Sequence, residues 1–128
     1  MMSKFAYTLF LCTFSSITLA QSWQCRNASA EISCDQKTCD INQDGFTPFD
    51  ISTNGKNELS VCAYTGCWDG KAKVFQSKNY LIVVSHYLQW SHNAKQSPTA
   101  FILNIDTKRK LGFIQGEGFA MPVHCTIT

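Results

Sequence analysis

Apolar and polar residues alternate with a period of two in several short segments of this chain. Residues 59–63 are Leu-Ser-Val-Cys-Ala, and residues 99–105 place Phe101, Leu103 and Ile105 on one side. This period is typical of half-buried β-strands, and no segment has a convincing helical period. Turn-forming residues separate about seven such segments at the spacing of all-β sandwiches and barrels. We therefore predict an all-β fold, a small antiparallel meander that forms a barrel or sandwich and is stapled by disulfides.

Residues 80–88 are the strongest strand candidate. They are apolar on both faces, which predicts a central strand in a sheet that is covered on both sides. Residues 36–57 are polar and contain Gly45, Pro48 and Gly55, so we expect mostly loop there. The expected strands cover residues 23–26, 30–34, 59–63, 72–74, 80–88, 99–105, 110–115 and 119–126.

Residues 59–75 are expected to form a β-hairpin. Two pairs within it, Thr65-Gly66 and Asp69-Gly70, favour a turn because glycine accepts a positive φ without steric cost. Either pair can reverse the chain. A turn at the first pair would bring Cys62 and Cys67 close enough for a disulfide, and we predict that bond.

The first twenty residues have the features of a secretory signal peptide. Lys4 is followed by an apolar run over residues 5–14, and residues 18–20 form a small-x-small cleavage site. The apolar run is too short to span a bilayer, although an N-terminal membrane anchor is the alternative. We expect a signal peptide at 1–20 and one secreted or periplasmic domain at 21–128, with no membrane contact after cleavage.

Six of the seven cysteines remain once Cys12 is removed with the signal peptide. An even number in a small secreted chain implies a disulfide framework. Six cysteines allow fifteen connectivities, and the sequence does not choose among them rigorously. Cys34 and Cys39 share the spacing of Cys62 and Cys67, so both pairs are expected to be local bridges. The remaining pair, Cys25 and Cys125, would then tie the two ends of the domain together.

Charge is unevenly distributed along the chain. Residues 31–58 hold six acids and two bases, whereas residues 71–110 hold seven bases and one acid. The two halves either balance each other across one fold or form a surface with two poles that steers a charged partner. The basic run 108–110 is too short to indicate a nucleic-acid site and lies where a hairpin tip is expected, so we expect no nucleic-acid partner.

Residues 40–45, Asp-Ile-Asn-Gln-Asp-Gly, match the first half of an acidic calcium loop. The segment resembles calcium loops of the EF-hand and dockerin kind. The likeness then ends, because Ile51 occupies the position of the bidentate acid and Pro48 argues against a following helix. A calcium site of another kind is one hypothesis, and an ordinary turn rich in Asp and Asn is the alternative. The candidate ligands for Ca²⁺ are Asp40, Asn42, Asp44, the carbonyl of Phe46, and Asp50.

Catalytic motifs are weak in this chain. No HExxH, GxSxG or CxxC spacing occurs, and fully paired cysteines would leave no thiol nucleophile. We assign no catalytic residue, and an enzyme is the less favoured class. A small secreted hydrolase that depends on His92 or Glu117 stays as an alternative.

The loop at residues 88–98 is the best candidate for contact with a partner. It places Trp90 beside Ser91, His92 and Asn93, a mix of an aromatic residue and adaptable polar groups that suits a binding hot spot. The alternative is that Trp90 folds back onto the sheet. Glu117, between two glycines, is a second candidate contact.

Together these features predict a small secreted or periplasmic binding protein whose partner is a protein. Its general build is similar to that of small periplasmic β-barrel inhibitors, such as those of lysozyme. The similarity concerns architecture and compartment only, and no residue roles follow from it. A second alternative, besides a hydrolase, is a calcium-stabilised extracellular module with a structural or adhesive role.

Overall fold

The chain forms eleven β-strands and no helix in the computed structural model, which describes residues 21–92 and 95–128. The predicted signal peptide lies outside the described residues. The predicted all-β class is confirmed. The strands are β1 (Trp23–Asn27), β2 (Glu31–Cys34), β3 (Cys39–Asn42), β4 (Asp50–Asn54), β5 (Glu58–Ala63), β6 (Gly66–Lys71), β7 (Lys73–Ser77), β8 (Tyr80–Trp90), β9 (Thr99–Asp106), β10 (Leu111–Gly116) and β11 (Phe119–Ile127).

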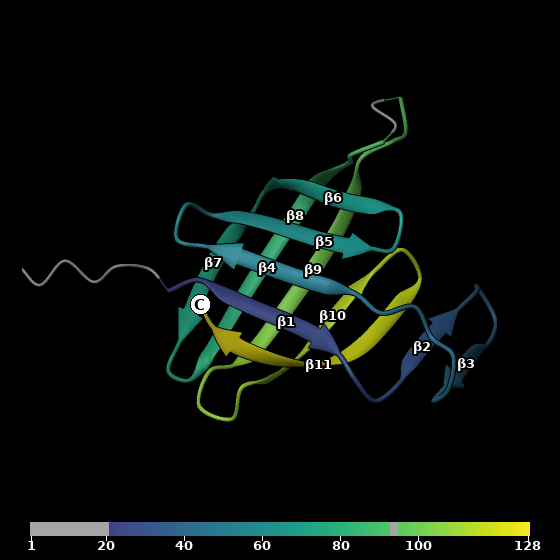
Figure 1. Ribbon diagram of the computed structural model, residues 1–128, viewed down its shortest axis with the longest axis horizontal. Helices are drawn as coiled ribbons and strands as arrows, with labels where there is room; N and C mark the ends of the chain where they lie inside the picture. Colours follow the sequence, from purple (N-terminus) through teal and green to yellow (C-terminus); the bar gives the residue numbers. More distant parts are fainter. Residues whose placement is uncertain (1–20, 93–94) are drawn as a thin grey trace, which may run out of the picture.

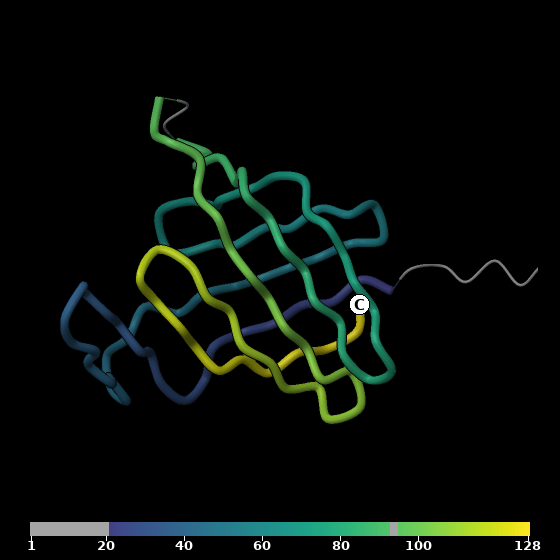
Figure 2. Tube along the Cα trace, turned by 180° about the vertical axis from the view of Figure 1, so that it is seen from behind, coloured from purple at the N-terminus to yellow at the C-terminus, as the bar shows by residue number. Residues whose placement is uncertain are grey.

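Eight of these strands form a closed antiparallel barrel, which settles the choice between barrel and sandwich. Its order is β1-β4-β5-β6-β8-β9-β10-β11, and β11 pairs back to β1. β7 extends β6 along β8, and the β2–β3 hairpin hangs from β11. Figure 1 shows β1, β4 and β5 crossing in front of β8, β9 and β10, and Figure 2 shows the same crossing from behind.

The interior of the barrel is filled by side chains from every second position of its strands. β9 shows the alternation most clearly, because Phe101, Leu103 and Ile105 are buried while Ile102 and Asn104 are exposed. Small barrels are packed in this way by their inward-facing residues. Candidate binding sites are therefore sought on the outer surface. The most deeply buried large side chains are Ile51, Leu59, Val61, Val83, Leu88, Leu103, Ile105, Ile114, Met121 and Val123.

All three predicted disulfides form, namely Cys25–Cys125, Cys34–Cys39 and Cys62–Cys67. Each joins residues that lie directly opposite one another on neighbouring antiparallel strands. Cys25 and Cys125 are buried between the first and last strands, so their bond closes the seam of the barrel. Three intramolecular disulfides are typical of extracellular or periplasmic proteins.

Residues 36–57 are mostly loop, as predicted, but they also contain two strands that the sequence did not predict, β3 and β4. β4 is a wall of the barrel, and it points Ile51 and Thr53 into the core. Its polar residues, Ser52 and Asn54, made the segment look like a loop. Pairing with both β1 and β5 overrides that local composition.

The expected hairpin at residues 59–75 turns at its first candidate position. Ala63 and Gly66 face each other across Tyr64 and Thr65, which directly follows the Cys62–Cys67 pair. The second candidate turn, Asp69-Gly70, instead lies inside β6. No helix in the described residues is long and apolar enough to cross a membrane.

Candidate functional site

The outer surface of strands β7 to β10 carries a cluster of apolar side chains among a few polar ones. Phe75, Ile82, Asn104 and Phe113 follow one another across four neighbouring strands. The rows on either side pair Tyr80 with Asp106 and Leu111, and Val84 with Ile102. We name this surface the apolar face, and it comprises Phe75, Tyr80, Ile82, Val84, Ile102, Leu111 and Phe113.

The apolar face is exposed to solvent. Phe75 is 55%, Phe113 56%, Tyr80 49%, Ile102 46% and Leu111 43% exposed. These are five of the nine exposed large hydrophobic residues in the described part of the chain. With about 200 Å² for an aromatic side chain, its three rings alone leave on the order of 300 Å² in water. A contiguous patch of that size on a soluble protein commonly marks an interaction site.

The prediction that residues 80–88 lie in a sheet covered on both sides was wrong. Leu81, Val83 and Ser85 are buried in the barrel, but Tyr80 is half-exposed on the outside. The apolar pattern correctly indicated that both faces of the strand carry apolar side chains. The chain covers only the inner one in the residues that the structure describes.

A hollow of about 260 Å³ lies on the apolar face. It is smaller than the roughly 300–1,000 Å³ of pockets for drug-sized ligands, so it suits one large side chain of a partner. Gly112 keeps the backbone of β10 close to β9, because a Cβ there would lie 2.0 Å from the carbonyl oxygen of Asn104. The hollow is lined by Tyr80, Asn104, Asp106, Leu111, Gly112 and Phe113.

Two turns bring lysines to the end of the apolar face beside this hollow. The backbone N–H and hydroxyl of Thr107 both donate to the carbonyl of Asn79, at 2.7 and 2.9 Å, which joins the β7–β8 turn to the β9–β10 turn. Lys78, Lys108 and Lys110 lie on these turns, and we name them the basic rim. Among the described residues, no salt bridge involves these three lysines.

Asp106, the acid nearest the basic rim in sequence, is neutralised by its own turn. The Arg109 backbone N–H donates to its carboxylate at 2.9 Å, and the Arg109 guanidinium donates at 3.0 Å. These contacts, with a further hydrogen bond from the Lys108 backbone, hold the pKa of Asp106 below its ordinary value. The positive charge of the basic rim therefore remains uncompensated by this acid.

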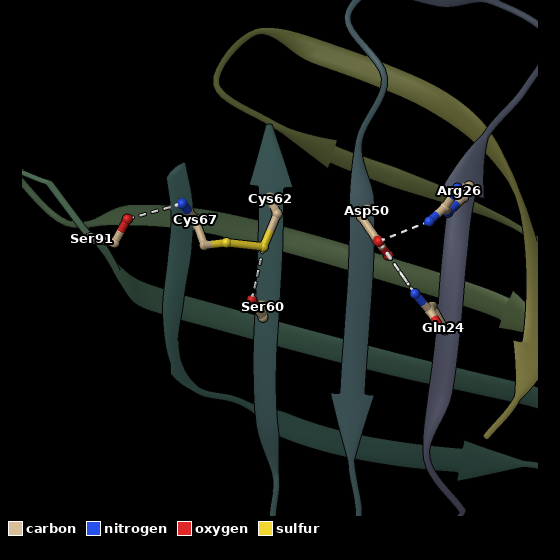
Figure 3. Close-up of a disulfide and its surroundings, with 7 residues drawn as sticks. All are labelled: Gln24, Arg26, Asp50, Ser60, Cys62, Cys67 and Ser91. Carbon is tan, nitrogen blue, oxygen red and sulfur yellow. Dashed lines mark hydrogen bonds and ion pairs between the residues drawn. A yellow bond between two sulfur atoms is a disulfide. The ribbon is translucent and has the colours of Figure 1, made fainter. Parts of the chain in front are cut away.

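The opposite wall of the barrel, formed by β1, β4, β5 and β6, is polar outside. Asp50 accepts hydrogen bonds from Gln24 at 2.9 Å and from Arg26 at 3.3 Å (Figure 3). Hydrogen bonds from Asn54 and Lys71, at 2.7 and 3.0 Å, hold the pKa of Glu58 below its ordinary value. A hollow of about 420 Å³ on this wall is lined mainly by such polar groups. Most of the charged groups on this wall are hydrogen-bonded to one another. The wall therefore carries the ordinary polar surface of a soluble domain and not an apolar patch for a partner.

The predicted partner loop at residues 88–98 is partly built into the barrel. Trp90 is the last residue of β8, and its ring lies 4.4 Å from that of Trp68, so it folds back as the alternative held. The Cys67 N–H donates to the Ser91 hydroxyl at 3.1 Å (Figure 3). His92 is exposed, and Asn93 lies outside the described residues. Partner binding by this loop stays a prediction.

Glu117 and His92 do not share a site in the described part of the chain. Glu117 is exposed in the turn between β10 and β11, next to the backbone of Cys34. His92 lies instead beside Gly66 of β6. No three His, Cys, Asp or Glu side chains gather into a metal-binding group among the described residues. The structure therefore adds no support to the hydrolase alternative.

The candidate calcium ligands are divided between the β2–β3 hairpin and the barrel. Asp40 and Asn42 lie on β3, and the Asp44 N–H donates to the Asn42 side-chain oxygen at 3.2 Å. Phe46 follows in the connection to β4. Asp50 lies on β4, where Gln24 and Arg26 already bind its carboxylate. Calcium binding stays a prediction, for which the hairpin supplies only part of the expected ligands.

The calcium hypothesis predicts a higher melting temperature in calcium than in chelator. A ligand at a hundredfold excess over its dissociation constant stabilises a fold by about 2.7 kcal/mol, which is several degrees for a domain of this size. Changing Asp44→Ala should remove the shift, whereas Asp69→Ala on the polar wall should leave it intact. An identical melting temperature in both conditions would contradict the hypothesis.

The residues of the apolar face were not predicted as a site. A signal was present, because residues 80–88 are apolar on both faces and Leu111 and Phe113 alternate with smaller residues. Sequence alone did not show that these positions meet on one outer surface, since that depends on the register of four strands.

No protein-family model, curated protein or solved structure matches this chain. Its function is therefore inferred from the chemistry of its surface.

Proposed function

We propose that this chain is a small secreted or periplasmic binding protein that docks a protein partner through the apolar face. The observation that carries this proposal is the gathering of Phe75, Tyr80, Ile102, Leu111 and Phe113 on one exposed surface. The three disulfides and the predicted signal peptide support the compartment.

The composition of the face favours a protein partner. Asn104 lies between Ile82 and Phe113 in the central row, and it is exposed. A protein can supply a hydrogen bond to this amide, whereas the acyl chains of a lipid would leave it unpaired at a cost in free energy. An apolar centre with few polar groups and a charged rim is the usual anatomy of a protein interface.

Inhibition of a secreted hydrolase such as lysozyme is the specific form of this function that we propose first. The small disulfide-bonded barrel and its compartment support this form by analogy of architecture. The apolar face, or the loop at residues 88–98 through its exposed His92, would cover the cleft of the enzyme. Unchanged activity across a panel of lysozymes mixed with this protein would sink the inhibitor version.

We expect Phe113→Lys to weaken partner binding at least tenfold. The substitution places a charge beside the hollow at the centre of the face, where truncation of an anchor residue typically costs more than about 1 kcal/mol. The control is Ser52→Lys on the polar wall, which adds the same charge away from the face. Partners captured from the secreted fraction by the wild type should be kept by the control and lost by Phe113→Lys, with affinities then measured by calorimetry. Equal affinity of both variants would contradict docking through the apolar face.

A further inference from the structure

We infer that the apolar face binds a second copy of this chain, through the hairpin formed by β2 and β3. This inference rests on the proposed function, because it names an occupant for the same face. The hairpin presents an apolar side chain among carboxylates, and the face presents an apolar hollow beside lysines. One chain therefore carries both halves of a complementary contact.

The hairpin projects from the side of the barrel (Figure 1). Only two residue pairs join it to β11. Its outer strand, β3, pairs only with β2 in the described residues, and all four residues of β3 are exposed. The Cys34–Cys39 disulfide links its two strands beside the tip. The hairpin is thus stabilised by its own disulfide and projects away from the barrel.

The exposed surface of this hairpin is apolar at one residue and acidic around it. Ile41 is 69% exposed, and its sequence neighbour Asp40 points to the other side of β3, because successive side chains of a strand alternate. Residues 31–44 hold four acids and one base, and we name them the acidic hairpin. At its tip, backbone N–H groups of Thr38 and Lys37 donate to Asp35 and hold the pKa of that carboxyl below its ordinary value. The hairpin is therefore negatively charged at neutral pH.

The apolar face is the matching surface. Tyr80, Leu111 and Phe113 form the apolar part of the lining of its hollow, which suits an aliphatic side chain such as that of Ile41. The acid in the lining, Asp106, is paired with Arg109. The basic rim stands beside it on the two joined turns. Opposite charges within about 8 Å, the screening length at physiological salt, attract each other in water. With Ile41 in the hollow, the net negative charge of the acidic hairpin as a whole would lie near the basic rim.

The acidic hairpin cannot reach the hollow of its own barrel. It is attached to β11 at Phe119 and Ala120, which pair with Gly116 and Gln115 at the end of β10. The hollow lies at Leu111, the other end of the same six-residue strand, about 17 Å away at roughly 3.4 Å per residue. Figures 1 and 2 place the hairpin and the β9–β10 turn at different sides of the barrel. The contact is therefore between copies and head-to-tail, a symmetry that produces rings or open chains.

A charge-swap experiment on the purified, oxidised protein tests this contact. The hairpin variant carries Asp40→Lys and Asp44→Lys, and the face variant carries Lys78→Glu and Lys108→Glu. All four positions are exposed, so both variants should have the melting temperature of the wild type. Sedimentation velocity should show self-association of the wild type as its concentration rises, either into a closed ring of two or more copies or into open chains. Each variant alone should associate at least tenfold more weakly, and an equimolar mixture of the two should recover the wild-type association.

Recovery in the mixture is the decisive result, because only a hairpin-to-face contact pairs the altered surfaces of two different chains. A third protein, Ile41→Ser, should also associate at least tenfold more weakly, which tests the apolar part of the contact. A monomeric wild type or a mixture that stays monomeric would overturn the inference. Binding of the monomeric wild type to phosphatidylglycerol vesicles, lost in the face variant, would overturn it in favour of a membrane surface. Loss of self-association with continued capture of another protein through Phe113 would refute this inference and leave the proposed function standing.

Discussion

Removing the Cys25–Cys125 bond with Cys25→Ala and Cys125→Ala should lower the free energy of unfolding by about 4.7 kcal/mol, the chain-entropy estimate for a loop of roughly 100 residues. The two cysteines are 100 residues apart in sequence and face each other in the core. Their bond holds β1 against β11, so it restricts the unfolded chain over almost the whole domain. Equilibrium unfolding in denaturant under oxidising conditions measures the loss.

The matched control is removal of the Cys62–Cys67 bond by the same substitutions. These cysteines are five residues apart across the β5–β6 turn, and the same relation gives about 2 kcal/mol for so short a loop. The ratio between the two losses is more informative than either value, because both variants lose two sulfur atoms. Equal losses would show that loop closure does not determine the stability of this barrel.

The disulfide framework was predictable because it depends on spacing. Two pairs with the same five-residue spacing left one pair for the chain ends, and short hairpin turns then brought the local pairs into register. The core of β9 was predictable for a similar reason, since its period of two is strict. The two short bridges and the core of β9 depend on local sequence, whereas Cys25–Cys125 was assigned as the pair that remained.

β4 was not predictable in the same way. Its alternation is short and is masked by polar residues such as Ser52 and Asn54, and only pairing with β1 and β5 makes it a strand. Trp90 is a second case in which local sequence was not enough, here because it suggested too much exposure. Its sequence neighbours are polar and suggested an exposed anchor, but Trp68, which lies 22 positions earlier, gives it a ring to pack against. Such distant contacts are absent from local composition.

The apolar face shows how a wrong prediction can still contain the correct signal. Residues 80–88 do carry apolar side chains on two sides, as their composition indicated. The sequence does not show whether residues of the same chain bury both sides of this strand. In the described residues the barrel core buries only the inner side. The outer side is therefore the candidate surface for binding a partner.

Leu103→Ala should lower the free energy of unfolding by about 2–5 kcal/mol, the usual range for a large-to-small change in a packed core. Leu103 is fully buried, and its neighbours in register, Val83 and Ile114, are fully buried too. A cavity there removes contacts with both adjacent strands of the barrel. Chemical denaturation monitored by the fluorescence of the buried Trp23 and the half-buried Trp68 and Trp90 measures the effect.

Ile102→Ala is the matched control, one residue away on the opposite side of β9. Ile102 is 46% exposed on the apolar face, so its truncation should cost less than about 1 kcal/mol. The same substitution should weaken partner binding, which Leu103→Ala should affect only through folding. If Ile102→Ala instead destabilises the fold as much as Leu103→Ala, the outer apolar residues are needed for folding. A small loss of stability would show that folding does not require an apolar side chain at position 102. Binding to a partner would then be the explanation that the surface chemistry supports.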